Sequence, residues 1–497
     1  MKKLFTRTYP QILAAFGALM LLFYLIFQTI PVFWSRLFFP LGLDHQEEIH
    51  ISILYQWLNE GKALYSVPSM DFSSWIYTPG YYFAAALWSK VAGLTLPSLR
   101  VFSWLCIFAT CIPACMSSQA ISKKWWPGLY WLPLYLAYLN LYGWIDLGMK
   151  DSFHILLCML GVAFLLKALF EEFTAKVAKK KKLNLYLSAL FWSLSFMTKQ
   201  TTLFLLAPLV IPFFIYFRRE SLIFCAATFL LIAAMMSACL LVWGNVFWTW
   251  VYVIPSHHMM DMRPLAEITK NFLIQAYPHF LIVLAALLIL FSSRDAKNRK
   301  LAFFSLALLA GAALGSFIPA AKIGGGSFSL VLLTASLAFV CVWMIEVLRP
   351  TPWIALLVLL PLSFKNVDQR AVPPSYEDAV KIVMQKIHAL PEKTWVAYHP
   401  WLAHLAGKKI YASADSIFGQ WFHGHQYVPE EIIDAGRYAY FDYIVLDAQT
   451  DLNILQPMGI YILQNYNVET TLPPSLLIVP RDGWQTRHVS VFLKKRD

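Results

Sequence analysis

Charged residues are scarce in this chain. Only 14% of its 497 positions are Asp, Glu, Lys or Arg, whereas 59% are hydrophobic. Soluble domains carry about a quarter charged residues, so this deficit excludes an ordinary soluble globular protein. Apolar runs of about 18 or more residues recur along the chain, and such runs are typical of helices that cross a bilayer. The composition predicts a polytopic α-helical membrane protein.

Cysteine is also scarce, and its placement excludes two kinds of site. All seven cysteines lie inside apolar segments, and none belongs to a CxxC pair. Thiols buried in apolar surroundings behave as small hydrophobic side chains. We therefore expect neither a disulfide framework nor a cysteine metal site.

The charge that is present is mainly positive, and it gathers in short patches between the apolar runs. The net charge is +12, and the patches are MKK at the N-terminus, SKK near 123, KVAKKKK at 176–182, FRRE near 218 and SSRDAKNRK at 292–300. A nucleic-acid-binding protein needs a basic face on a soluble fold. Cytoplasmic loops that follow the positive-inside rule explain the patches more simply, so no nucleic-acid partner is expected.

Placing each basic patch in the cytoplasm predicts the topology. The first apolar run is too long for a cleaved signal peptide and is a signal anchor that leaves the cytoplasm. The stretch 79–94, PGYYFAAALWSKVAGL, is short and contains Lys90, so we expect a juxtamembrane or re-entrant helix on the outer face. About eleven spans remain, with a cytoplasmic N-terminus and an outer C-terminus: 11–34, 101–121, 126–143, 152–170, 184–198, 201–217, 221–243, 272–291, 301–318, 328–346 and 352–364.

The composition changes at about residue 365. A polar linker and an amphipathic helix pattern are followed by short β-like runs, TWVAYH, KKIYAS, YIVLDA and SLLIVP. About 130 residues can bury a core of their own. We predict a multi-spanning transmembrane domain at 1–364, with outer loop one at 35–100, and a small extracytoplasmic α/β domain at 365–497.

Outer loop one gathers carboxylates in a helical pattern. In DHQEEIHISILYQWLNEG, residues Asp44, Glu47 and Glu48 fall at i, i+3 and i+4 and are expected to share one face. Carboxylates one turn apart repel each other, which strengthens them as proton acceptors and suits a general base. A solvated helix face is the plainer interpretation. His50 with Glu47 also has the spacing of a weak metal-ligand pair.

Further ionisable residues are predicted at the same outer surface. Charged side chains at a membrane boundary are costly unless they are paired or used, so they indicate a site. Lys199 lies between two apolar helices, where it either contacts a lipid phosphate or snorkels to the interface. Asp151 and Lys150 either belong to the site or pair with each other. The other outer candidates are Asp146, His154, Gln200, His257, His258, Asp261, Arg263 and Lys322, which precedes Gly324 to Gly326.

With these residues in place, the chain resembles the GT-C class of integral-membrane glycosyltransferases, in particular bacterial lipid-sugar transferases and protein-mannosyltransferase-like enzymes. Four stretches carry the resemblance: the loop-one acids followed by GKALY and YTPGYY, then GMKDSFHILL, MTKQTTLFLLAP and AAKIGGGSFSL. Such enzymes usually carry an Asp-Glu pair about fourteen residues before the glycine. Here that position holds Glu47 and Glu48, or Asp44 if there is a small insertion.

The resemblance implies an inverting transfer of a hexosyl or pentosyl group from a polyprenyl-phosphate carrier to a hydroxyl of a lipid, glycan or protein acceptor. Glu47, Glu48 or Asp44 is then the base and Asp151 a further catalytic residue. Lys199 holds the phosphate, helped by Lys322 or Arg100. The remaining substrate-binding candidates that this implies are Gln200, Tyr77 and Tyr81.

The resemblance also implies a location in the inner (plasma) membrane of the cell envelope. A lipid-linked donor requires no nucleotide cofactor, and no glycine-rich nucleotide fingerprint is visible; the need for a divalent metal is left open. Three alternatives stay open. A transporter or flippase of a lipid-linked saccharide would show internal repeats and paired charges near the midplane. The others are a polysaccharide polymerase or ligase and a non-catalytic glycan-binding protein.

Overall fold

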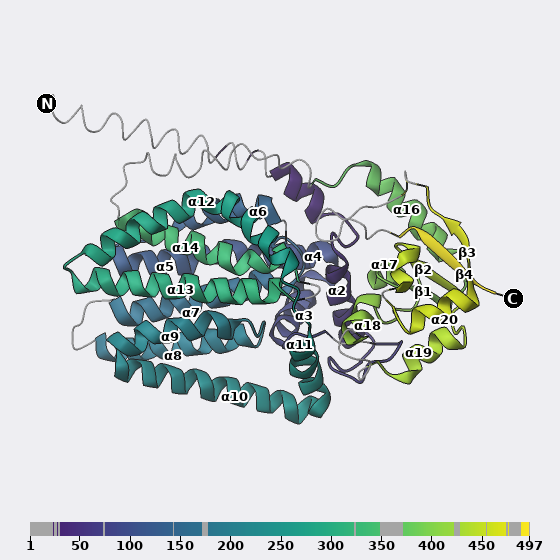
Figure 1. Cartoon of the computed structure of the whole chain (residues 1–497), viewed down its shortest axis with the longest axis horizontal. Coiled ribbons are helices and arrows are strands. Elements are labelled where there is room, and N and C mark those ends of the chain that lie inside the picture. The colour runs from purple at the N-terminus through teal and green to yellow at the C-terminus, as the bar shows by residue number, and fades with distance from the viewer. Residues whose placement is uncertain are drawn as a thin grey trace.

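The computed structural model describes residues 30–72, 75–142, 144–170, 177–322, 325–347, 371–421, 428–453, 455–473 and 489–496, with Phe23, Phe27 and Leu476. These residues form three successive layers (Figure 1). Long helices lie side by side in a bundle at one end, and a small sheet with short helices lies at the other. Between them is a middle layer that includes α2, α3, α4 and α11. We call the three the bundle, the middle layer and the C-terminal layer.

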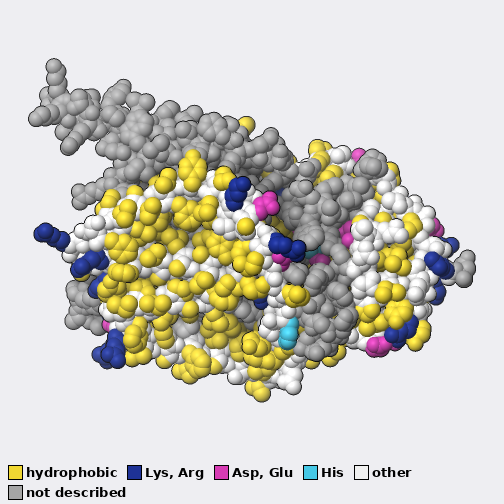
Figure 2. Space-filling view, in the orientation of Figure 1, with side chains coloured by type: hydrophobic (Ala, Val, Ile, Leu, Met, Phe, Trp, Pro, Cys, Tyr) yellow, Lys and Arg dark blue, Asp and Glu magenta, His cyan; other side chains and the backbone are white. Residues whose placement is uncertain are grey.

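The bundle consists of long apolar helices. They are α5 (Cys111–Ser122), α6 (Trp131–Tyr142), α7 (Lys150–Phe170), α8 (Val177–Phe196), α9 (Thr202–Tyr216), α10 (Arg218–Trp248), α12 (Arg263–Ser292), α13 (Ala296–Ala320) and α14 (Val331–Val347). Exposed apolar side chains cover the outside of the bundle, for example Phe229, Leu230 and Leu241 on α10, and Figure 2 shows a broad apolar surface over this region. Helices that are apolar on all sides are typical of membrane spans.

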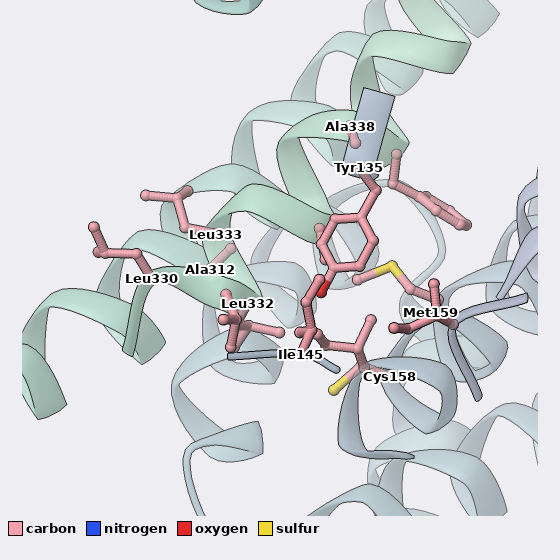
Figure 3. Packing of buried hydrophobic residues seen from close by; sticks show 14 of the residues in the cluster. Tyr135, Ile145, Cys158, Met159, Ala312, Leu330, Leu332, Leu333 and Ala338 are labelled. Atoms are coloured by element: carbon pink, nitrogen blue, oxygen red, sulfur yellow. The ribbon is translucent and has the colours of Figure 1, made fainter. Parts of the chain in front are cut away.

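The bundle core is closely packed. Figure 3 shows Tyr135 of α6 among Ile145 and the α7 residues Cys158 and Met159, with Leu332 and Leu333 of α14 nearby. Small residues bring backbones together, as at Gly311 of α13, where an added Cβ would collide with the backbone of Leu205 on α9. Small residues at helix interfaces allow this kind of approach in membrane bundles.

Four helices of the described residues are long and apolar enough to cross a membrane, namely Leu96–Ser122, Lys150–Phe170, Arg218–His257 and Ala296–Ala320. A bent pair, Arg263–Tyr277 with His279–Ser292, makes a fifth if it counts as one span. Each predicted span from 101–121 to 328–346 falls on helical residues. The predicted span 352–364 and most of 11–34 lie outside the described residues, so the number eleven stays a prediction.

The middle layer contains the helices that the sequence predicts for loop one. They are α2 (His45–Leu58) and α3 (Gly80–Ala92). Beside them lie the short α11 (Ile254–His257) and α4 (Leu96–Ala109), which is the first part of the candidate span Leu96–Ser122. Asp44 is the N-cap of α2, since its side chain accepts a hydrogen bond from the Gln46 amide at 2.8 Å. The 13 residues of α3 are too few for a core about 30 Å thick.

The C-terminal layer contains a four-stranded mixed sheet with the strand order β1-β2-β4-β3. Strand β1 pairs in parallel with β2, and β4 pairs antiparallel with both β2 and β3. The elements are α16 (Ser375–His388), β1 (Thr394–Val396), α17 (Pro400–Leu405), α18 (Ala414–Trp421), α19 (Glu430–Arg437), β2 (Tyr443–Leu446), α20 (Met458–Asn465), β3 (Tyr466–Thr471) and β4 (Val491–Lys495).

Two of the predicted β-like runs, TWVAYH and YIVLDA, contain strands β1 and β2. The prediction of a strand at KKIYAS is wrong, because residues 408–413 have no strand pairing. Most of SLLIVP and the predicted boundary at 364/365 lie outside the described residues.

The C-terminal layer rests on loop one. The Ala412 amide donates to the Met70 carbonyl at 2.7 Å, and the Gln56 side chain donates to the Ile410 carbonyl at 3.4 Å. Helix α17 also packs on α2. Loop one therefore lies between the bundle and the C-terminal layer, and the polar side chains at the start of α2, Asp44, Glu47, Glu48 and His50, are buried.

Candidate functional site

A buried cluster of charged residues lies where α7 meets the turn between α8 and α9. The Lys199 ammonium donates to Asp151 Oδ1 at 2.7 Å, and Lys150 Nζ lies 3.9 Å from Asp151 Oδ2. Lys150, Asp151 and Lys199 are 2%, 4% and 8% exposed. Asp151 and Lys199, two candidates from the sequence, are thus in contact, and Lys150 is a second cation beside the same carboxylate.

The turn that carries Lys199 is held in place by loop one. The Thr78 hydroxyl donates to the Phe196 carbonyl at 2.9 Å, and the Gly80 amide donates to the Met197 carbonyl at 2.5 Å. The Gln200 amide group donates to the carbonyls of Ile76 and Val251. Gln200 therefore fixes the backbone here, and its amide nitrogen is already engaged.

Helix α2 enters the same cluster through His50. The Lys150 ammonium lies 3.5 Å from His50 Nε2 and 4.0 Å from the centre of the Tyr77 ring, a cation–π contact. His50 Nδ1 is 2.9 Å from the Tyr82 hydroxyl. Burial, together with the charge of Lys150, lowers the pKa of His50 well below its usual value, so this imidazole is neutral.

The cluster has an excess of positive charge. Two ammonium groups, Lys150 and Lys199, face one carboxylate, Asp151, and His50 adds no charge. Although burial lowers the pKa of Lys199, the neighbouring Asp151 carboxylate raises it, and the net pKa lies above its usual value. Lys199 therefore stays protonated. A buried excess cation stabilises an anion that enters the cluster, because the local dielectric is low.

Glu47 pairs with Arg100 of α4. Arg100 Nε donates to Oε1 at 2.8 Å and Nη2 to Oε2 at 2.6 Å, a two-point ion pair between side chains that are at most 1% exposed. The amides of Gly148 and Leu43 donate to the same carboxylate at 2.7 and 3.0 Å. Both oxygens of Glu47 are therefore engaged by an arginine and two backbone amides.

Arg100 is engaged just as fully. Besides Glu47, its guanidinium donates to the backbone carbonyls of Arg36, Phe39 and Leu41. Arg100 therefore holds the chain that enters α2.

Glu48 faces the C-terminal layer. Its carboxylate lies 3.2 Å from His399 Nδ1 and accepts the amides of Gly42 and Leu402 at 3.1 and 3.2 Å. On its other side, His399 Nε2 lies 3.3 Å from Asp447 Oδ1. Although burial lowers the pKa of His399, the Asp447 and Glu48 carboxylates raise it well above its usual value. Glu48 is a docking residue between layers.

Asp44 is the loop-one acid whose carboxylate is least engaged. Its Oδ1 caps α2, whereas Oδ2 is buried and accepts no hydrogen bond from the described residues. His45 Nδ1 lies 3.4 Å from this Oδ2, and His45 Nε2 forms an ion pair with Asp415 of α18. The expected common face of Asp44, Glu47 and Glu48 is therefore absent, because the three carboxylates turn towards three different neighbours.

The remaining candidates lie around this arrangement. The Tyr81 hydroxyl donates to the Gly148 carbonyl at 2.6 Å, next to the Glu47 contact. Lys322 is half-buried and donates to the Pro255 carbonyl at 2.6 Å, a contact with the end of the α10–α11 segment. Its ammonium group therefore binds that segment and not the acid of the charged cluster. Gly324 lies outside the described residues.

The suggested metal pair is not assembled. Glu47 binds Arg100, while the two ring nitrogens of His50 face Tyr82 and Lys150. Within the described parts of the chain, no group of three or more His, Cys, Asp or Glu side chains is placed to hold a metal ion.

Sequence reasoning missed the histidines that join the layers. His45 and His399 each lie between two carboxylates, one from α2 or its cap and one from the C-terminal layer. His45 stood beside Asp44 in the sequence, which was a usable signal. The partners Asp415 and Asp447 lie more than 350 positions away from α2 and its cap, and nothing local marks them.

No model of a known protein family matches the chain, and no curated protein matches it either. Solved structures do match. ArnT from Cupriavidus metallidurans bound to undecaprenyl phosphate is 9% identical, with a TM-score of 0.60 over 95% of this chain and 97% of that one. The Archaeoglobus fulgidus oligosaccharyltransferase in its apo form is 11% identical, with a TM-score of 0.53 over 90% of this chain and 72% of that one. AglB from the same organism, in complex with an inhibitory peptide and a dolichol-phosphate, is 9% identical, with a TM-score of 0.53 over 95% of this chain and 74% of that one.

Proposed function

We propose that this chain, which has the fold of the GT-C class of integral-membrane proteins, is a glycosyltransferase. It moves a sugar from a polyprenyl-phosphate carrier to a hydroxyl of a lipid, glycan or protein acceptor, with inversion at C1. The observation that carries the proposal is the buried cluster of Lys199, Lys150 and Asp151, whose excess cation suits a phosphate group.

The charge of the cluster fits the chemistry of such a donor. A sugar joined to a polyprenyl phosphate is a phosphodiester with one negative charge, and the leaving polyprenyl phosphate gains a second. Fixed cations that face this growing charge stabilise the transition state more than the ground state. Lys199 and Lys150 are assigned this role, and Asp151 holds Lys199 in place.

Asp44 is the proposed base. Its Oδ2 takes the proton from the acceptor hydroxyl, the acceptor oxygen bonds to C1 of the sugar, and the bond from C1 to the phosphate oxygen breaks. Asp44 caps the helix that carries His50, and six residues of α-helix rise about 9 Å along the axis. The proposed base and His50 of the cluster are therefore separated by about this distance along α2. Glu47 and Glu48 hold α2 in position.

The proposed site faces outward, away from the cytoplasm. The turn that joins α12 to α13 belongs to the basic segment 292–300 and lies at the end of the bundle farthest from the sheet (Figure 1). Figure 2 shows Lys and Arg side chains at that end. With this end in the cytoplasm, the middle layer and the C-terminal layer lie outside an inner (plasma) membrane.

The test uses membranes that contain the full chain and a set of labelled undecaprenyl-phosphate sugars, with the label followed into lipid, glycan and protein. Wild-type membranes should transfer label, and membranes with Lys199→Ala should not. The matched control is Lys381→Ala, because Lys381 forms an exposed ion pair with Asp378. Movement of an intact labelled donor across the membrane without transfer would instead support a flippase. Absence of both would contradict the proposal.

A further inference from the structure

His45 occupies a position between two carboxylates from opposite ends of the chain. Its Nδ1 is 3.4 Å from Asp44 Oδ2, and its Nε2 forms an ion pair with Asp415. Asp44 and His45 are 1% and 6% exposed, and the Asp415 side chain is 13% exposed. The three groups form one line of contacts, from α18 of the C-terminal layer to the cap of α2.

This line of contacts carries alternating charge. Although burial lowers the pKa of His45, the Asp415 and Asp44 carboxylates raise it to about 10, so the imidazole is a cation at neutral pH. Asp415 and Asp44 are the charged groups that act on it. The His45 ring beside Asp44 restricts the rotation of that carboxylate, while Oδ2 stays without a hydrogen bond from the described residues.

The two contacts of His45 are not equivalent. Asp44 is its neighbour in the chain, whereas Asp415 reaches it only when the C-terminal layer is docked. The orientation of the imidazole therefore depends on a residue outside the middle layer. The second bridge, Glu48–His399–Asp447, crosses the same boundary, but its Glu48 carboxylate has two further partners, the amides of Gly42 and Leu402.

We infer that Asp415 is a positioning residue for sugar transfer: through His45 it holds the Asp44 carboxylate in its orientation, so the C-terminal layer completes the catalytic centre. The inference rests on the proposed function, because it requires Asp44 to be the base. Asp415 touches neither donor nor acceptor. Its effect reaches the reaction only through His45.

The experiment measures kcat and KM for the full chain from pH 6 to 10.5, with the labelled undecaprenyl-phosphate sugar that wild-type membranes turn over. Asp415→Asn should lower kcat about 10-fold or more with KM for the donor unchanged. It should also move the alkaline loss of activity to lower pH, because it removes a carboxylate that keeps His45 charged. Asp415→Glu should restore part of kcat and of the pH profile.

Asp447→Asn is the matched control, since it neutralises the equivalent acid of the other bridge. It should lower thermal stability but leave the pH profile of kcat unchanged. His45→Gln removes the titrating group, so kcat of this variant should no longer fall at alkaline pH. It serves as the second variant if Asp415→Asn does not fold.

The inference is overturned if Asp415→Asn and Asp447→Asn give the same pH profile as the wild type, with kcat falling only as folded protein falls. The inference is also overturned if kcat of His45→Gln falls at alkaline pH in the same way as kcat of the wild type. These outcomes leave the proposed function intact, because wild-type membranes still transfer sugar. Failure of the wild type to transfer any labelled sugar would instead contradict the proposed function itself.

Discussion

Lys199 and Asp151 form a buried ion pair although they are 48 positions apart, one in the turn after α8 and the other in the first turn of α7. Lys150 lies on the other side of the same carboxylate. If Lys199 is removed, Asp151 still lies beside Lys150. Its buried negative charge therefore still has a positive partner, and the fold is not left with an unpaired carboxylate. This makes Lys199 suitable for separating a role in binding or catalysis from a role in folding.

Lys199→Ala should lower transfer about 100-fold to 1,000-fold, the size of effect seen when one fixed charge-stabilising donor is removed. Lys150→Ala should give a similar loss. Initial rates with a labelled polyprenyl-phosphate sugar measure this, with protein in the membrane quantified in parallel. Unchanged rates for both variants would exclude the cluster as the phosphate site.

Asp44→Asn should abolish most transfer without destabilising the protein. Asn is as good an N-cap as Asp, so α2 still begins at the same residue, but the amide cannot accept the acceptor proton. The expected loss is about 100-fold to 10,000-fold in kcat, with a melting temperature close to that of the wild type. Glu60→Gln is the control, because Glu60 belongs to a partly exposed ion pair with Lys62. Full activity of Asp44→Asn would exclude it as the base.

Arg100→Met should destabilise the protein by about 3–5 kcal/mol, because it leaves the buried carboxylate of Glu47 without its partner. Thermal unfolding in detergent measures the change. The double variant Glu47→Gln with Arg100→Met should recover part of the loss, since no buried charge then remains unpaired. Arg263→Met is the matched control at an exposed pair with Asp261. If Arg100→Met and Arg263→Met are equally stable, the proposed structural role of Arg100 is wrong.

Alkaline pH should weaken the contact between the C-terminal layer and α2. The pKa values of His45 and His399 are both raised in the folded protein, to about 10 for His45. Their contribution to stability is therefore fully present below the unfolded value of about 6.5, and it is lost as pH rises through the folded pKa. The melting temperature of the wild type should fall between about pH 6.5 and 10, and less so in His45→Gln with His399→Gln. Identical pH dependence would contradict this linkage.

The helices of the bundle could be predicted because each depends on a local pattern. The spans from 101–121 to 328–346 coincide with helical residues, and the short stretch 79–94 coincides with α3. Helices were also predicted in loop one. The first of them, α2, begins after Asp44, whose side chain accepts a hydrogen bond from the Gln46 amide as an N-cap. The number of crossings stays a prediction, because two of the expected spans fall largely outside the described residues.

The site was only partly predictable, because proximity between distant segments is not a local property. Asp151 and Lys199 stood out as charges at helix ends, and they do meet. The roles of Glu47 and Glu48 could not be read from their i, i+1 spacing. Each turns to a partner that the sequence does not indicate, Arg100 for Glu47 and His399 for Glu48. The contact between His45 and Asp415 could not be predicted either, because these residues also lie far apart in the sequence.

The contacts of α2 impose an order on assembly. Glu47 can be neutralised as soon as α4 is made, but Glu48 must wait for His399, about 350 residues later in the chain. During synthesis the middle layer therefore carries an uncompensated acid until most of the protein exists. A nascent chain that stops before residue 399 would lack the histidine that faces Glu48, so water would have to solvate this carboxylate.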